Sequence, residues 1–219
     1  MVTGLTLLHT SAVHVPVFDA LRDRDHPGAV LRHLVVPELL DRARAKGPES
    51  VAPDLRELLA GSAGPVLVTC STIGAVAESL AGELGVLVLR VDRPMAAAAV
   101  RAGPRITVLA ALESTLGPTE ALLAEETDGR PAVITTRVVA GAWDRFEAGD
   151  GAGYLALVAE AADAVADADV IVLAQASMAG AAALAATSVP VLSSPAPGLA
   201  AAIAAAGHPA AVDTPQGAC

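Results

Sequence analysis

The residue of this sequence best suited to chemistry is Cys70, which ends an apolar run and precedes an Ala-rich segment with helical spacing. A thiol at the start of a helix lies near the helix dipole and unpaired backbone amides, which lower its pKa from about 8.5 toward neutrality. Such a thiol could give a proton to a substrate carbon or take one from it. The alternative is that Cys70 is a small buried apolar residue without a chemical role.

The segment around Cys70 is repeated 105 positions later, where Gln175 stands in place of the cysteine. Residues 66–74 read VLVTCSTIG and residues 171–179 read IVLAQASMA, so each is an apolar run followed by small residues. A repeat of this length predicts two similar lobes related by a pseudo-two-fold axis, with the two turns face to face. A ligand could then bind between Cys70 and Gln175.

Short continuous runs rich in Val, Ile and Leu alternate along the chain with segments of helical spacing. Such runs are typical of strands buried on both faces of a parallel sheet, and the alternation predicts the α/β class. We expect two pseudo-symmetric lobes, each a parallel sheet flanked by helices, with the ligand cleft between them. Residues 1–93 plus 194–219 would form the first lobe, and residues 94–193 the second. The expected strands are residues 5–8, 65–69, 86–89, 105–110, 132–136, 170–174 and 190–192. The expected helices are residues 34–45, 51–60, 73–84, 94–102, 118–126, 154–166, 178–186 and 199–206.

The loops that follow the predicted strands are rich in Ser and Thr. In open parallel sheets ligands bind at these loops, where helices begin, although N-capping of those helices is an alternative role for the hydroxyls. The pairing of Thr72 with Ser177 across the repeat favours binding, because two helix N-termini would aim free N–H groups at one carboxylate or enediolate. The residues expected to bind the substrate are Thr10, Ser11, Ser71, Thr72, Thr115, Thr119, Gln175, Ala176 and Ser177.

His9 ends the first predicted strand of the lobe that contains Cys70. It could tune the thiol or serve as a second catalytic acid/base, because imidazole titrates at about pH 6.5. The alternative is a structural histidine whose ring bonds to the backbone. The other histidines do not have the spacing of metal ligands, so no metal site is expected.

The composition argues against nucleic acid and against a membrane. The 219 residues carry a net charge of -10, and the arginines are scattered, so no basic surface for nucleic acid is expected. Residues 170–212 have no formal charge, but their four prolines and their alanine content argue against a membrane span.

The single lysine and the two cysteines limit the chemistry further. Lys46 lies in a polar linker, where a Schiff base with pyridoxal phosphate is not expected, so the predicted chemistry needs no cofactor. Cys70 and Cys219 indicate no disulfide framework, which favours a reducing, cytoplasmic location.

Four segments together resemble the Asp/Glu racemase superfamily, which also contains hydantoin racemases, maleate isomerase and arylmalonate decarboxylase. They are TCST at 69–72, DRPM at 92–95, TLGPT at 115–119 and DVIVLAQASM at 169–178. The resemblance covers nearly the whole chain. It implies a two-lobed enzyme without a cofactor, in which two cysteines, one per lobe, flank the substrate Cα. One cysteine removes a proton and the other delivers one, and Cys70 matches the first position.

The second cysteine position is occupied by Gln175, and a carboxamide is not an acid or base of useful pKa. Arylmalonate decarboxylase also has one cysteine, at the second position, and it protonates an enediolate from one side after loss of carbon dioxide. We therefore expect decarboxylase-like or isomerase-like chemistry at a small carboxylate or carbonyl substrate, with Cys70 as the acid/base. Two alternatives stay open: an amino-acid or hydantoin racemase with a non-thiol second base such as His9, and a non-catalytic ligand-binding homologue. The sequence also leaves a homo-oligomer open.

Overall fold

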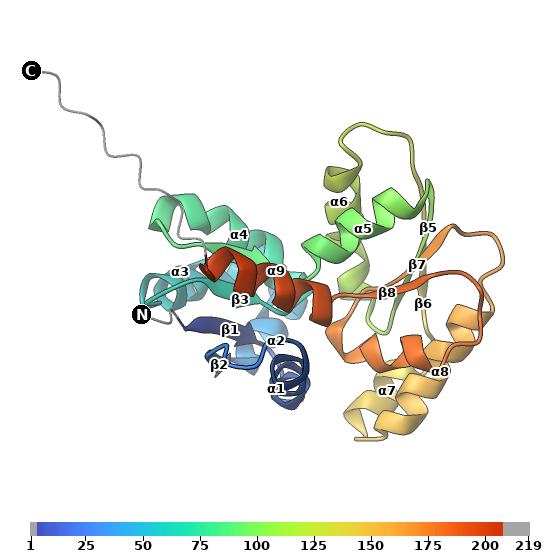
Figure 1. The fold of residues 1–219 in the computed structure, drawn as a ribbon, viewed down its shortest axis with the longest axis horizontal. Coiled ribbons are helices and arrows are strands. Elements are labelled where there is room, and N and C mark those ends of the chain that lie inside the picture. Colours follow the sequence, from blue (N-terminus) through green and yellow to red (C-terminus); the bar gives the residue numbers. More distant parts are fainter. Residues whose placement is uncertain (1–3, 208–219) are drawn as a thin grey trace, which may run out of the picture.

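The computed structural model describes residues 4–207. Residues 1–3 and 208–219, which include Cys219 and the last part of the predicted first lobe, lie outside the described residues. The chain forms two α/β lobes side by side, each built on a four-stranded parallel sheet (Figure 1). The expected fold class and two-lobed architecture are confirmed.

The first lobe surrounds a sheet with the strand order β2-β1-β3-β4. Its central strand β3 is a continuous apolar run, and all three of its residues are buried. Its strands are β1 (Leu5–His9), β2 (Leu31–Val35), β3 (Val66–Val68) and β4 (Val88–Arg90), and its helices are α1 (His14–Asp25), α2 (Pro37–Lys46), η1 (Pro48–Val51), α3 (Ala52–Ala60) and α4 (Ser71–Leu84).

The second lobe repeats this order as β6-β5-β7-β8, so the repeat in the sequence is also a repeat of topology. All four residues of β7 are buried, as those of β3 are in the first lobe. Its strands are β5 (Arg105–Ala110), β6 (Val133–Val138), β7 (Val170–Leu173) and β8 (Val191–Ser193), and its helices are α5 (Arg93–Ala102), η2 (Glu113–Thr115), α6 (Leu116–Thr127), α7 (Ala142–Glu147), α8 (Gly151–Asp163) and η3 (Ala176–Ala183).

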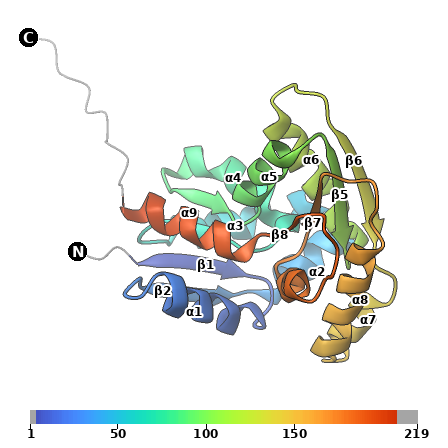
Figure 2. The ribbon, with the colours of Figure 1, turned by 45° about the vertical axis from the view of Figure 1, so that its right-hand side comes forward.

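The last described helix, α9 (Pro195–Gly207), returns to the first lobe and lies beside β1 and β3 (Figures 1 and 2). Leu199 and Ala202 on this helix share one buried cluster with Leu5, Leu7 and Leu67 of the first sheet. The lobe limits at residues 93/94 and 193/194 stay a prediction.

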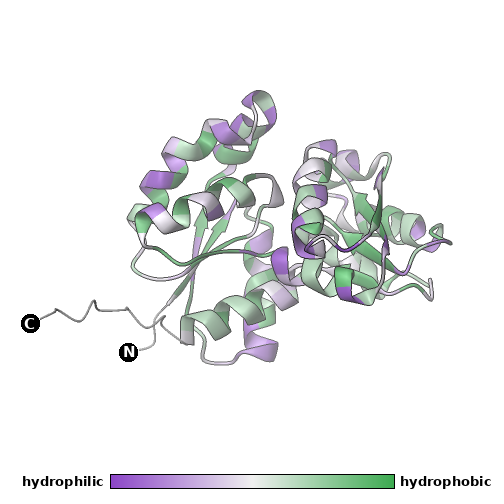
Figure 3. Cartoon of the chain, turned by 90° about the horizontal axis from the view of Figure 1, so that it is seen from above, coloured by the Kyte–Doolittle hydropathy of each residue, from purple (hydrophilic) through white to green (hydrophobic). Residues whose placement is uncertain are grey.

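The cores lie between the sheets and the helices, where apolar residues concentrate on the strands and on the facing sides of helices (Figure 3). Small side chains let the helices approach closely. On α5, for example, Ala96 and Ala99 pack against Ile106 and Val108 of the second sheet. Within the described residues, no helix is both long enough and apolar enough to cross a membrane.

All seven strands predicted from the sequence occur within two residues of their predicted bounds, but the strand β2, the α-helices α1 and α7 and the short 3₁₀ helices η1 and η2 were not predicted. The expected helix at residues 34–45 is wrong at its start, because its first two residues belong to β2. This edge strand is only half-buried and includes Arg32 and His33, so it lacks a continuous apolar run. Helix α1 buries only Phe18 fully, and α7 spans only six residues, so their periodic signals are weak.

A second correction concerns residues 178–186, which were expected to form an α-helix. The chain instead forms the 3₁₀ helix η3 over residues 176–183. Gly180 of this helix lies so close to α8 that an added Cβ would be 2.8 Å from Leu155 Cδ1. The helix that follows β7 is therefore wound more tightly than α4, which follows β3 in the first lobe.

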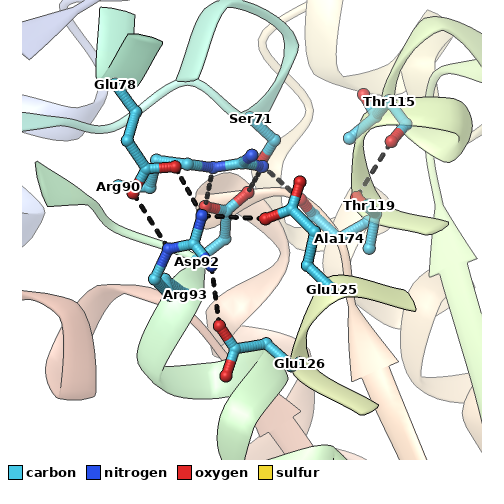
Figure 4. Close-up of polar contacts among 10 residues, drawn as sticks. All are labelled: Ser71, Glu78, Arg90, Asp92, Arg93, Thr115, Thr119, Glu125, Glu126 and Ala174. Atoms are coloured by element: carbon cyan, nitrogen blue, oxygen red, sulfur yellow. Dashed lines mark hydrogen bonds and ion pairs between the residues drawn. The ribbon is translucent and has the colours of Figure 1, made fainter. Parts of the chain in front are cut away.

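Arg93, at the first crossing between the lobes, ties them together (Figure 4). Its guanidinium pairs with Glu78 on α4 and also with Glu126 and Glu125 on α6, at 2.7 and 3.0 Å. Hydrogen bonds from the guanidinium, first to Glu78 and then to the other two carboxylates, raise the pKa of Arg93. This network holds α4, and with it Cys70, the residue before α4, against the second lobe.

Candidate active site

Strands β3 and β7 end at equivalent points, each followed by one extended residue that precedes a helix. That residue is Cys70 in the first lobe, with φ -110° and ψ 115°, and Gln175 in the second, with φ -118° and ψ 139°. The amides just before them donate to the carbonyls of Leu8 and Leu109, at 3.0 and 2.9 Å. The backbone therefore places a thiol and an amide at matching positions.

Both residues line one cleft between the lobes, with a free volume of about 470 Å³ that includes the space at its open mouth. The first lobe contributes mainly hydroxyls, and the second lobe contributes hydroxyls and two aromatic rings. The lining residues are Thr10, Ser11, His14, Leu40, Thr69, Cys70, Ser71, Thr72, Leu112, Thr115, Trp143, Phe146, Gln175, Ala176 and Ser177.

Nine of the eleven residues expected at the site line this cleft, and their roles stay predictions. The two others, His9 and Thr119, do not line it. Thr119 is buried in α6, where its hydroxyl donates to the carbonyl of Thr115 at 2.9 Å. This is a contact within one helix, so Thr119 is a helix-stabilising residue in this fold.

The thiol of Cys70 is half-buried and is surrounded by hydrogen-bond donors. Burial raises the pKa of Cys70, while bonds from the hydroxyls of Thr10 and Thr72 and from the amides of Ile73 and Thr72 act in the opposite direction. The expected net lowering of this pKa is therefore wrong, because the cost of burying a thiolate outweighs the donors at the helix start. At neutral pH the sulfur holds its proton.

The side chain of Gln175 is anchored to the loop after β5. Its Oε1 atom accepts hydrogen bonds from the amides of Ala111 and Leu112, at 2.6 and 3.2 Å. The oxygen is thus occupied, and what Gln175 has left for a ligand is its NH₂ donor. Gln175 can orient a substrate oxygen here, but it cannot exchange a proton with carbon.

Two hydroxyls of the cleft also hold the structure together. Ser71 Oγ donates to the carbonyl of Ala174 at 3.1 Å and so links the start of α4 to the end of β7 across the lobes (Figure 4). Ser177 Oγ is 2.8 Å from the hydroxyl of Tyr154 on α8. These contacts fix where the two helix N-termini point.

His9 lies behind the wall of the cleft and is fully buried. Thr69 Oγ1 donates to the carbonyl of Leu8 and therefore accepts from His9 Nδ1, at 2.8 Å. The other nitrogen of His9 is 2.8 Å from His33 Nδ1, and His33 Nε2 is 3.3 Å from a carboxylate oxygen of Asp19. Both ring nitrogens of His9 are therefore engaged within the protein.

We expect the buried His9 to make the fold sensitive to acid. Burial, with smaller contributions from His14 and His33, lowers the pKa of His9 to about 3. Between about pH 6.5 and this value the unfolded chain binds a proton that the native chain does not, so stability is complete above about pH 6.5 and falls as the pH falls. His9 alone should lower the free energy of unfolding by about 2 kcal/mol between pH 6.5 and pH 5, and the buried His14, whose pKa is lowered to about 4, should add a loss of similar size.

Urea denaturation at pH 5, 5.5, 6, 6.5 and 7 measures this loss. The control variant His26→Gln changes a histidine outside the His9–His33 pair, and it should show the same loss as the unmodified chain. A free energy of unfolding that stays constant from pH 6.5 to pH 5 would contradict the prediction.

Three of the four aromatic residues of the chain gather at one side of the cleft, a feature that the sequence analysis missed. The rings of Trp143 and Phe146 stack at 4.9 Å, and Tyr154 lies 5.3 Å from Phe146. Arg44 of the first lobe lies over the Trp143 ring at 5.7 Å, which joins the lobes on this side. Because the chain has so few aromatic residues, the occurrence of three of them within residues 143–154 was a signal in the sequence that could have indicated this part of the site.

Besides Trp143 and Phe146, four further lining residues were not among the expected site residues. His14 begins α1, a helix that was not predicted, and Thr69 precedes Cys70 within a motif that was recognised. No local sequence signal marks the others, because they reach the cleft only through the packing of the two lobes. They are Leu40 and Leu112.

Comparison with known proteins identifies the fold and a family. Residues 11–212 match the model of a family described as Asp/Glu/hydantoin racemase. The aspartate racemase of Picrophilus torridus has a TM-score of 0.69 and 14% identity, over 93% of this chain and 94% of that chain. The allantoin racemase of Klebsiella pneumoniae has a TM-score of 0.63 and 16% identity, over 94% of this chain and 88% of that chain.

A third solved structure is a liganded double mutant of arylmalonate decarboxylase, with one glycine replaced by cysteine and one cysteine by serine. It has a TM-score of 0.61 and 22% identity, over 94% of both chains. At these identities the structural likeness shows the fold alone. A search of the curated proteins finds no match.

Proposed function

This chain belongs to the Asp/Glu/hydantoin racemase family, and from that membership we propose that it is a cofactor-independent enzyme that transfers a proton at a carbon next to a carboxylate or carbonyl. The observation that carries the proposal is the pair of equivalent strand ends in one cleft, with a thiol at Cys70 and an amide at Gln175. Only the thiol can exchange a proton near neutral pH. The proposed reaction is therefore one-sided, as in a decarboxylase or an isomerase.

The state of Cys70 supports proton donation as its first step. Because burial raises its pKa, the sulfur carries a proton that it can give to a carbanion. If the reaction is a decarboxylation, the bond between Cα and the leaving carboxylate breaks, and its electron pair stays on the substrate, which becomes an enediolate. Carbon dioxide leaves, and the Cys70 proton goes to Cα. The thiolate is then stabilised by the hydroxyls of Thr10 and Thr72 until a proton from water restores it.

The surroundings of the thiol suit a small carboxylate with an apolar part. The first amides of α4 and η3 and the hydroxyls beside them can bind the anionic oxygens. The stacked rings of Trp143 and Phe146 offer an apolar wall for a substituent on the other side. Aspartate, allantoin and arylmalonate, in the names of the neighbours, are likewise small molecules with a carboxylate or carbonyl group.

Incubation in deuterium oxide tests the proposal. We expect a panel of 2-substituted malonates to include a substrate that loses carbon dioxide and gains one deuteron at Cα, in one configuration only. A panel of amino acids and 5-substituted hydantoins serves for comparison. Deuterium at Cα in both enantiomers of an amino acid or hydantoin would show a racemase instead. Binding of a compound without deuterium incorporation into any of them would show a non-catalytic homologue.

A further inference from the structure

His14 is the histidine whose ring lines the cleft beside Cys70. Its Nδ1 atom is buried and has no hydrogen-bond partner among the described residues. Among residues 4–207, the other buried side-chain atoms without a partner belong to Ser114 and Ser194, and neither residue lines the cleft. Because buried polar groups are normally paired, an unpaired ring nitrogen beside a cleft calls for an explanation.

The surroundings of His14 determine its charge state. Burial alone lowers the pKa of His14 to about 4, and no carboxylate opposes this effect. The titratable groups near it are His9, whose ring centroid is 6.1 Å away, and Cys70 in the same cleft, with His33 and Asp19 behind His9. The ring is therefore neutral at physiological pH, with one N–H donor and one acceptor nitrogen.

The unpaired Nδ1 atom indicates which nitrogen carries the proton. A buried N–H without a partner is rarer in proteins than an under-used acceptor, so the proton belongs on Nε2. The buried Nδ1 atom then carries the lone pair, and Nε2–H is the group left to donate a hydrogen bond to a ligand. A neutral donor of this kind stabilises an oxyanion without protonating it.

We propose that His14 is a catalytic residue whose neutral imidazole donates a hydrogen bond from Nε2–H to the substrate oxygen that becomes negative as the proton moves at Cα. This inference rests on the function proposed above. It assigns to α1 a direct role at the substrate, with the oxyanion held between the start of this helix and the amides of α4. It also gives His9 and His14 different roles. His14 binds the substrate oxygen, and His9 supports the wall of the cleft.

Binding of malonate, used as a small dicarboxylate probe, tests the contact independently of turnover. The variant His14→Leu removes the donor, whereas His14→Gln keeps an NH₂ group near the position of Nε2. We expect the Kd of malonate to rise at least tenfold in His14→Leu and to stay within about threefold of the unmodified value in His14→Gln. His26→Gln, at the other end of α1, is the matched control and should bind normally.

Nitrogen NMR of the unmodified chain gives a second measurement that needs no variant to fold. We expect His14 in the Nε2–H tautomer, with its Nε2 signal shifted on addition of malonate. An unchanged Kd in His14→Leu, or an Nδ1–H tautomer, would overturn the inference. If malonate binds through His14 and no compound of the deuterium panel turns over, the contact stands and the proposed reaction fails. If a substrate turns over and His14→Leu retains full kcat, the reaction stands and the role of His14 fails.

Discussion

The variant Cys70→Ala is expected to lose about 10²- to 10⁴-fold in kcat on a substrate that the deuterium panel identifies. The thiol is the group that exchanges a proton with Cα, and Gln175 on the opposite side cannot replace it. Alanine leaves the extended backbone before α4 and the Ser71 bond to Ala174 in place. We therefore expect the KM to change much less than kcat.

Two comparisons make this result specific to the thiol. Cys219→Ala removes the other cysteine of the chain and should retain full activity. Because burial raises the pKa of Cys70, alkylation by iodoacetamide should be slow at pH 7, accelerate as the pH rises, and inactivate the chain in proportion to the modification of Cys70. Undiminished turnover by Cys70→Ala would contradict the proposed mechanism.

The variant Asp92→Ala is expected to destabilise the fold by about 3–5 kcal/mol, because it leaves a buried charge without a partner. Arg90 is 2% exposed and Asp92 is 1% exposed, and two hydrogen bonds of 3.0 Å join their side chains (Figure 4). This pair packs under α4, where a Cβ on Gly74 would lie 3.0 Å from Arg90 Nε. Loss of the pair should therefore also disturb the helix that follows Cys70.

Urea denaturation at pH 7 measures the loss of stability in Asp92→Ala. Arg56→Ala breaks the exposed pair with Glu83 and serves as the control, with an expected effect of at most about 1 kcal/mol. The double variant Arg90→Met, Asp92→Leu replaces both charges with apolar groups and should recover most of the stability lost in Asp92→Ala. Equal effects of Asp92→Ala and Arg56→Ala would show that the buried pair does not stabilise the fold.

The fold could be predicted largely because the central strands are buried on both faces. A strand such as β7 must be apolar at every position, so it appears in the sequence as an unbroken run. The edge strand β2 meets solvent and accommodates Arg32 and His33, so its sequence resembles that of a loop or helix. Helix α1 escaped notice for a similar reason, since Phe18 is its one fully buried residue.

The candidate site could be predicted wherever a residue follows a central strand, as Cys70 and Gln175 do. Residues that reach the cleft from elsewhere could not be found in this way. Trp143 and Phe146 lie on a short helix, and the packing of α7 near Arg44 of the other lobe brings them to the cleft. His14 lies five residues beyond His9 in the chain, yet it is His14 that lines the cleft.

Local patterns along the chain were enough to predict the two-lobed α/β architecture, the repeat, and one thiol and one amide at equivalent strand ends. These features follow from the order of apolar runs and of the small residues after them. The packed fold was needed to establish which histidine lines the cleft and in which direction the pKa of Cys70 moves. Burial and hydrogen bonding are properties of the space around a group, and both lobes must pack together before that space exists.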